Sequence, residues 1–95
     1  MVSVLVRLKF APEDRREVAE MLKQLAAESR REPGVVTLIP HVVQDDPDTV
    51  VLYEQYRDEK AFTEHRATEH FKKYVTAGLY QKMRERSVES LLALI

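Results

Sequence analysis

Hydrophobic and polar positions alternate along residues 2–10, which read "VSVLVRLKF". A period of two places one set of side chains on a buried face, which is typical of a β-strand. After Pro12, apolar residues recur instead at spacings of three and four, as at Val18, Leu22 and Leu25. This pattern predicts an amphipathic helix of roughly five turns, which ends at the "EPG" motif around Pro33.

The remaining segments predict a hairpin, two short helices and a final strand. Residues 35–43 form a second strand, in which Pro40 indicates an edge or a bulge because proline donates no ladder hydrogen bond. The sequence "QDDPD" predicts a turn before a third strand at residues 49–57. Asp58 and Thr68 are suitable N-caps for two short helices, and residues 88–95 are apolar enough for a last strand.

This order of elements, β-α-β-β-α-β, predicts an α+β fold of the ferredoxin-like, split βαβ type. We expect a single domain over residues 1–95, with an antiparallel sheet and its helices on one face. The apolar second face of the sheet, including Leu5, Val35, Ile39 and Val51, then needs a cover. We expect a twofold homodimer that packs sheet on sheet in a dimeric α/β-barrel-like assembly.

Composition excludes several classes of protein. The chain has 15 basic and 16 acidic residues, which are interspersed, so it lacks the basic face of a nucleic-acid-binding protein. It contains no cysteine, which rules out disulfides and thiolate metal sites. The first apolar run meets a charge at Arg7 and is too short for a signal peptide or a membrane span. We therefore expect a soluble, cytoplasmic protein.

Candidate chemistry is concentrated in "YEQYRDEKAFTEHRATEHF", residues 53–71. Strand parity directs Glu54 and Tyr56 toward the helices together with Leu52. Helical spacing turns His65 inward, and His70 shares a helix face with Tyr74 four residues later. These polar groups converge between sheet and helices in this interpretation. On residue types and spacing alone, however, hydrogen-bonded core residues are the commoner explanation of such a pattern.

The stretch "EPGVVTLIPHVVQDDPDTVVLYEQYRDEKAFTEHRATEHFKKY" resembles the antibiotic biosynthesis monooxygenase (ABM) family. The resemblance covers nearly the whole chain and implies a dimeric ferredoxin-like fold. It implies that Glu54, His65 and His70 line or border a pocket, and we take these three as candidate catalytic residues. Candidate substrate-binding residues are Tyr56, Phe62, Phe71 and Tyr74.

The family includes cofactor-free quinol and anthrone monooxygenases, haem-degrading oxygenases and an isomerase of a phosphorylated signal molecule. The haem-degrading branch resembles this chain poorly. Arg7 stands near its strand asparagine, Val75 stands in place of its ligand histidine, and the chain has no tryptophan. We therefore expect no haem and no other cofactor. We also expect no metal, because the histidines lack HxH or HxxxH spacing.

Three functions stay open at this stage. The first is a cofactor-independent monooxygenase of a small quinol-like or aromatic substrate, with a histidine as the base. The second is an isomerase or degrading enzyme for a small, possibly phosphorylated carbonyl compound, for which Arg57, Arg66, Lys72 and Lys73 are candidate phosphate ligands. The third is a small-molecule binding domain without catalysis. An apolar, aromatic-lined cavity favours the first, basic residues at the cavity mouth favour the second, and a filled core favours the third.

Overall fold

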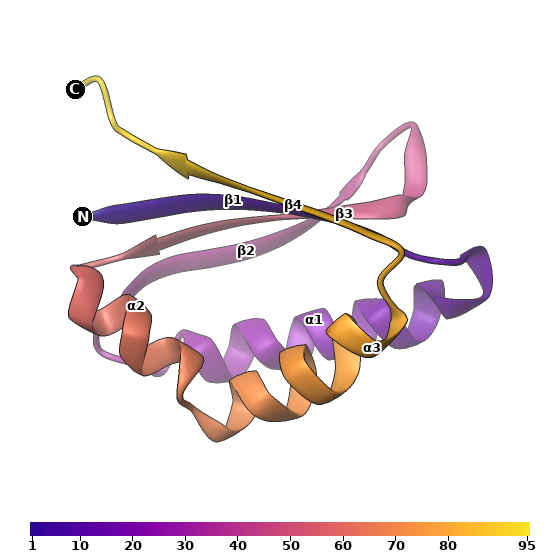
Figure 1. Ribbon diagram of the computed structural model, residues 1–95, viewed down its shortest axis with the longest axis horizontal. Coiled ribbons are helices and arrows are strands. Elements are labelled where there is room, and N and C mark those ends of the chain that lie inside the picture. Colours follow the sequence, from indigo (N-terminus) through magenta and orange to yellow (C-terminus); the bar gives the residue numbers. More distant parts are fainter.

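A computed structural model describes residues 1–95 (Figure 1). Its elements, in chain order, are β1 (Val2–Lys9), the 3₁₀ turn η1 (Pro12–Asp14), α1 (Arg15–Ser29), β2 (Val35–Val43), β3 (Asp46–Tyr56), α2 (Glu59–Arg66), the π-helical segment η2 (Phe71–Leu79), α3 (Tyr80–Lys82) and β4 (Glu85–Leu91). The predicted order of strands and helices is confirmed, with the second helical region divided among α2, η2 and α3.

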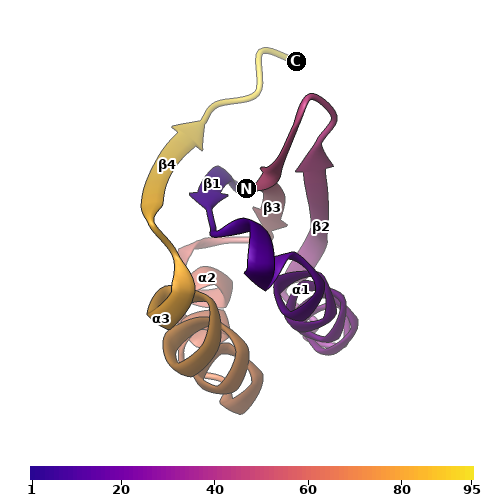
Figure 2. The same ribbon diagram turned by 90° about the vertical axis from the view of Figure 1, so that its right-hand side faces the viewer.

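The four strands form one antiparallel sheet in the order β2-β3-β1-β4. All helices lie on one face of it, with α1 beside the run of η2 and α3 (Figure 2). This is the predicted ferredoxin-like α+β arrangement. Since β2 is an edge strand, Pro40 stands where a missing ladder donor costs least, as expected.

The core lies between the sheet and the helices. The inward residues of the central strands, including Leu8, Val50 and Leu52, pack against the apolar stripe of α1. Leu22 and Leu25 of that stripe are both buried. Burial of each such side chain stabilises the fold by about 1.5–3 kcal/mol, and the alternation of strand residues is what aligns them with the helix.

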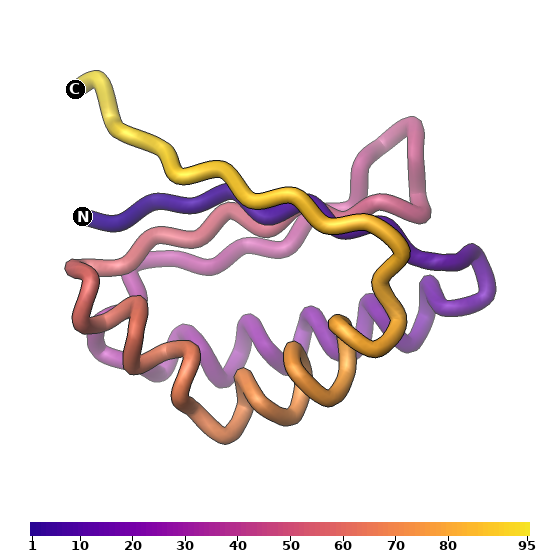
Figure 3. The backbone as a smooth tube through the Cα atoms, viewed as in Figure 1, coloured from indigo at the N-terminus to yellow at the C-terminus, as the bar shows by residue number.

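Two predicted strand boundaries and the predicted facing of one residue are wrong. The hairpin turn contains only two residues, because Val43 already pairs with Asp46 and β3 therefore starts earlier than expected. The last strand covers Glu85–Leu91, since Leu91 pairs with Ser3 close to the start of β1 and residues 92–95 lie beyond it (Figure 3). Val35 packs partly buried against the core instead of facing outward, because a register shift between Val35 and Thr37 reverses the alternation.

The outer face of the sheet is not covered by any element of the chain (Figure 1). Leu5 and Tyr53 are paired across β1 and β3 on this face, and Ile39 of β2 is 39% exposed beside them. None of the helices is both long and apolar enough to cross a lipid bilayer.

Gly34 allows the loop after α1 to approach α2 closely. Its φ angle is not positive, so the turn does not require glycine for backbone conformation. A Cβ atom at this position would instead lie 2.4 Å from the Cβ of Ala61. The loop that carries Glu32 can therefore contact α2 only because this residue lacks a side chain.

We expect Gly34→Ala to lower the free energy of unfolding by about 1–3 kcal/mol, because the new methyl group meets a rigid Cβ and forces a shift. Urea denaturation measures this change. Gly78→Ala is the matched control. Its new methyl group would meet Met21 Sδ at 2.6 Å, near the end of a flexible side chain, and alanine is the better helix former. Equal destabilisation by both substitutions would contradict the close approach as the cause.

Candidate functional site

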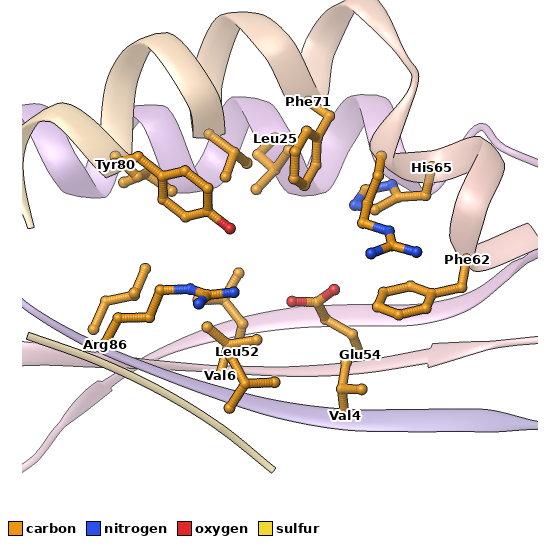
Figure 4. A pocket seen from close by; sticks show the side chains of 15 residues that line it. Val4, Val6, Leu25, Leu52, Glu54, Phe62, His65, Phe71, Tyr80 and Arg86 are labelled. Carbon is orange, nitrogen blue, oxygen red and sulfur yellow. The ribbon is translucent and has the colours of Figure 1, made fainter. Parts of the chain in front are cut away.

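A cavity of about 110 Å³ lies between the inner face of the sheet and the helices (Figure 4). Eleven of its 15 lining residues are hydrophobic. The strands contribute Val4, Val6 and Leu52, and the helical layer contributes Phe62, Phe71 and Tyr80. The volume is somewhat below the roughly 150 Å³ of an apolar protein cavity that admits benzene. One aromatic ring therefore fills it, and any substituent extends to its open mouth.

Glu54 places a carboxyl group at the sheet side of this cavity (Figure 4). As strand parity predicts, it faces the helices, and it is 8% exposed. Burial raises the pKa of Glu54, and this is opposed in part by the hydrogen bond from Tyr56 and by nearby His65. The protonated carboxyl group, which is able to donate a hydrogen bond to a ligand, therefore persists to a higher pH than in a solvated glutamate.

Tyr56, two residues further along β3, forms a hydrogen bond with Glu54. Its hydroxyl group donates a hydrogen bond to Oε1 of Glu54, and the residue is fully buried. Burial, and next the neighbouring Glu54 carboxylate, raise the pKa of Tyr56, so the phenol keeps its proton as a donor. Its ring centroid lies 4.8 Å from that of Phe62 and 5.2 Å from that of His65, which links the strand to α2.

His65 is held by a carboxylate 33 residues away. Its Nδ1 lies 2.8 Å from Oε2 of Glu32, and the side chain is 2% exposed. With the Nδ1 proton donated to Glu32, the lone pair of the neutral imidazole is on Nε2. Nε2 forms no hydrogen bond within the chain, and His65 lines the cavity. The nitrogen that a ligand meets is therefore the basic one.

His70 forms a hydrogen bond with the same carboxylate oxygen. Its Nε2 lies 2.7 Å from Oε2 of Glu32, and its side chain is 16% exposed. It does not line the cavity. His70 thus helps to fix Glu32, which in turn orients His65.

Local capping interactions position both histidines. Asp58 caps α2 by accepting a hydrogen bond from the amide of Ala61 at 2.8 Å, as predicted. At the other end of α2, the Thr68 hydroxyl donates to the carbonyl of His65 at 2.7 Å and accepts from the amide of Phe71 at 3.2 Å. Thr68 therefore joins the end of α2 to the start of the next helical segment.

The structure places the predicted site residues in three groups. Glu54, Phe62, His65 and Phe71 line the cavity. Tyr56 and His70 lie behind it, in contact with Glu54 and Glu32 respectively. Tyr74 is in neither group, because it packs against the main core cluster while Lys73 lies over its ring.

Of the four candidate phosphate ligands, Arg66 lines the cavity, whereas Arg57, Lys72 and Lys73 do not. Sequence reasoning missed Glu32, Tyr80 and Arg86. The sequence shows Glu32 in the "EPG" turn that follows α1, which marks the residue as part of a turn. It gives no indication of its histidine partners, because they are more than 30 residues away.

Glu32, His65 and His70 offer three ligand atoms of the kinds that bind Zn²⁺. Donor atoms held tetrahedrally at about 2.0–2.2 Å from one zinc ion lie more than roughly 3 Å from each other. Here the two imidazole nitrogens are 2.8 and 2.7 Å from the carboxylate oxygen. The carboxylate oxygen would have to move away from both imidazole nitrogens for the three to hold a metal, and the observed distances are those of hydrogen bonds.

We expect Glu54→Gln to change how stability depends on pH. Below its ordinary value near 4.5, the carboxyl group is protonated in both folded and unfolded chains. As pH rises above that value, the unfolded chain loses the proton first, because burial raises the folded pKa. The stability of the wild type relative to the Glu54→Gln variant therefore falls with pH, by at most about 1.4 kcal/mol per pH unit, and levels off above the folded pKa.

Urea denaturation of both proteins between pH 4 and pH 8 measures this difference. Glu20→Gln, on the exposed side of α1, is the control and should show no such trend. A constant difference between wild type and the Glu54→Gln variant over this range would contradict the raised pKa.

Comparison with known proteins agrees with this fold. The profile of a family described as "Antibiotic biosynthesis monooxygenase" matches residues 1–77. No curated protein matches the chain. Among solved structures, a candidate antibiotic biosynthesis monooxygenase from Bacteroides thetaiotaomicron is similar at 34% identity and a TM-score of 0.92, with 99% of this chain and 90% of that chain covered.

Two further structures are similar over the full length of both chains. One is an antibiotic biosynthesis monooxygenase at 28% identity and a TM-score of 0.92. The other, from Nitrosomonas europaea, is a candidate member of the same class at 25% identity and a TM-score of 0.93.

Proposed function

Because the chain belongs to the antibiotic biosynthesis monooxygenase family, we propose that it is a cofactor-independent monooxygenase of a small quinol or enolisable phenol. The observation that carries this proposal is the placement of His65. It is a buried histidine, fixed through Nδ1 by Glu32, at the wall of a largely apolar cavity. Such a pair of carboxylate and imidazole is a suitable general base near neutral pH.

The reaction starts when Nε2 of His65 takes a proton from the substrate, which leaves an electron-rich anion. This anion transfers one electron to dioxygen, and the two radicals combine to form a carbon–oxygen bond. The peroxide takes the proton back from His65. The carbon that bears the peroxide then loses its hydrogen as a proton while the O–O bond breaks, and this proton and the departing hydroxide form water. A quinol and dioxygen thus yield a hydroxyquinone and one water molecule, and the substrate supplies all four electrons.

Glu54 and Tyr56 contribute a hydrogen-bond donor to this chemistry. Because burial raises the pKa of Glu54, its carboxyl group is more readily protonated than that of a solvated glutamate, and in that form it stabilises negative charge as it develops on a substrate oxygen. The hydrogen bond from Tyr56 keeps this carboxyl group oriented. The apolar walls exclude water, which strengthens both interactions.

Oxygen consumption with a panel of one-ring and two-ring quinols tests the proposed function. We expect one hydroxyquinone for each dioxygen consumed and one oxygen atom from labelled dioxygen in the product. Release of hydrogen peroxide instead of a hydroxylated product would contradict monooxygenation.

One observation favours the isomerase as a second candidate. Arg66 and Arg86 line the cavity, and basic residues there suit a phosphorylated carbonyl compound. Glu54 and His65 would then act as acid and base on the two sides of a ketone. A wild-type protein that turns over no quinol but interconverts a phosphorylated hydroxyketone would establish this function. Binding of either class of compound without turnover would favour the third function, a small-molecule binding domain without catalysis.

We further propose that the protein is a homodimer that buries the outer face of the sheet. An exposed apolar patch with Ile39, Leu5 and Tyr53 is typical of an interface between subunits. Sedimentation velocity at micromolar concentration should give about twice the chain mass of 11.1 kDa. Ile39→Asp should give the monomer, because it buries a charge in the interface.

The control is Val42→Asp, which adds the same charge to the same strand beside a surface hollow shared with α1. This variant should stay dimeric. A wild-type protein that sediments as a monomer would overturn the proposed assembly.

A further inference from the structure

Two arginines line the cavity in addition to its apolar walls. Arg66 is the last residue of α2, and Arg86 lies on the edge strand β4. Arg86 extends toward the cavity at the end where Tyr80 lies, and His65 and Phe62 lie at the other end (Figure 4). Figure 4 also shows the Tyr80 hydroxyl group directed into the same space.

Neither arginine has a partner of opposite charge. Arg15, by contrast, bonds Asp48 at 2.6 Å, and Arg31 lies 3.8 Å from Glu28. Arg66 and Arg86 form no salt bridge and no side-chain hydrogen bond. Their N–H donors are therefore available to a ligand.

Aromatic rings of the cavity wall hold both guanidinium groups in place. The Arg66 guanidinium carbon lies 4.4 Å from the centroid of the Phe62 ring, and that of Arg86 lies 5.4 Å from the Tyr80 ring. Such cation–π contacts restrict the side chain but satisfy none of its hydrogen-bond donors. This reduces the entropy that the arginine loses when it binds an anion.

The charge of the cavity is thus unbalanced. Its only acidic lining residue is Glu54, which hydrogen-bonds with Tyr56 and is buried at the sheet side. A ligand that complements this cavity has an apolar ring for the interior and a negative charge for the arginines at the mouth.

We propose that the substrate carries a carboxylate or phosphate group, which Arg86 binds with the help of the Tyr80 hydroxyl group. The ring of the substrate then extends toward Glu54 and His65, where the proposed chemistry takes place. Arg66 adds positive charge to the same cavity from the α2 side. This inference rests on the proposed small-molecule site and narrows its substrate class to aromatic acids or aryl phosphates.

Binding without oxygen tests the inference separately from turnover. Isothermal titration calorimetry compares hydroquinone with 2,5-dihydroxybenzoate, which adds one carboxylate, and with 4-hydroxyphenyl phosphate. We expect wild type to bind an anionic probe at least about ten-fold more tightly than hydroquinone, as charge-assisted bonds to arginine are strong. The anionic probe that binds more tightly shows whether the site takes a carboxylate or a phosphate. The preference for an anion should weaken as the salt concentration is raised.

Arg86→Ala should abolish most of this preference, so that the anionic probes bind about as weakly as hydroquinone. Arg86→Lys should retain part of it, because the charge remains but the bidentate geometry is lost. Arg16→Ala removes an exposed arginine of α1 far from this cavity and is the control. Circular dichroism confirms that each variant is folded.

Equal affinity of wild type for neutral and anionic probes, absence of binding by all three, or an unchanged preference in Arg86→Ala would each overturn the anion site. Oxygen turnover of neutral quinols without any anion preference would support the monooxygenase and overturn the anion site. Tight binding of an anionic probe, without oxygen consumption on any quinol, would support the anion site and overturn the monooxygenase.

Discussion

Replacing His65 with alanine lowers kcat for quinol oxygenation by about 10²–10⁴-fold, the usual contribution of a general base. The reason is geometric: His65 is the histidine that lines the cavity, with Nε2 unpaired. His70→Ala lowers kcat much less, because His70 contacts only the carboxylate behind His65. Stopped-flow or electrode measurement of oxygen consumption gives both values.

Folding is measured alongside, since removal of a buried imidazole leaves a cavity and an unpaired Glu32. His65→Gln is the second variant, because it fills more of the volume and is able to hydrogen-bond with Glu32 while it lacks a basic nitrogen. Wild-type turnover in folded His65→Gln and folded His70→Ala would exclude histidine as the base. A lower kcat in His70→Ala than in His65→Ala would assign the base to His70.

Glu32→Gln is the second large expected effect, a fall in kcat of about ten- to a thousand-fold with little change in KM. Both histidines bond the single oxygen Oε2 of Glu32, and an uncharged amide oxygen in that place accepts the two hydrogen bonds more weakly than the carboxylate does. An amide N–H directed at Nδ1 of His65 would shift the imidazole proton to Nε2, and the base would be lost. KM changes little because Glu32 does not line the cavity.

Glu28→Gln is the matched control, because Glu28 lies on α1 one turn earlier and pairs only with the exposed Arg31. It should keep wild-type turnover. Glu32→Gln should also be less stable than Glu28→Gln, since a buried histidine is left with a weaker partner. A folded Glu32→Gln protein with wild-type kcat would show that Glu32 holds the fold together without positioning the base.

Local pattern alone was sufficient for the architecture of this protein. Alternation along β1 and β3 and the three- and four-residue spacing along α1 each depend on which face of one element is buried. The buried face of one element is determined by the order of consecutive residues, so it can be predicted from the sequence. The same reasoning directed Glu54 inward, and the caps at Asp58 and Thr68 are local for the same reason. It failed at Val35, where the register shift is set by the partner strand.

The centre of the candidate site was decided by tertiary structure. The carboxylate that holds His65 and His70 comes from Glu32, 33 and 38 residues away, and it reaches them because Gly34 lets the loop close on Ala61. Arg86 meets the cavity only because β4 returns to pair with β1. Periodicity has no information on such contacts, since they depend on how elements pack and not on the order of residues within any one of them.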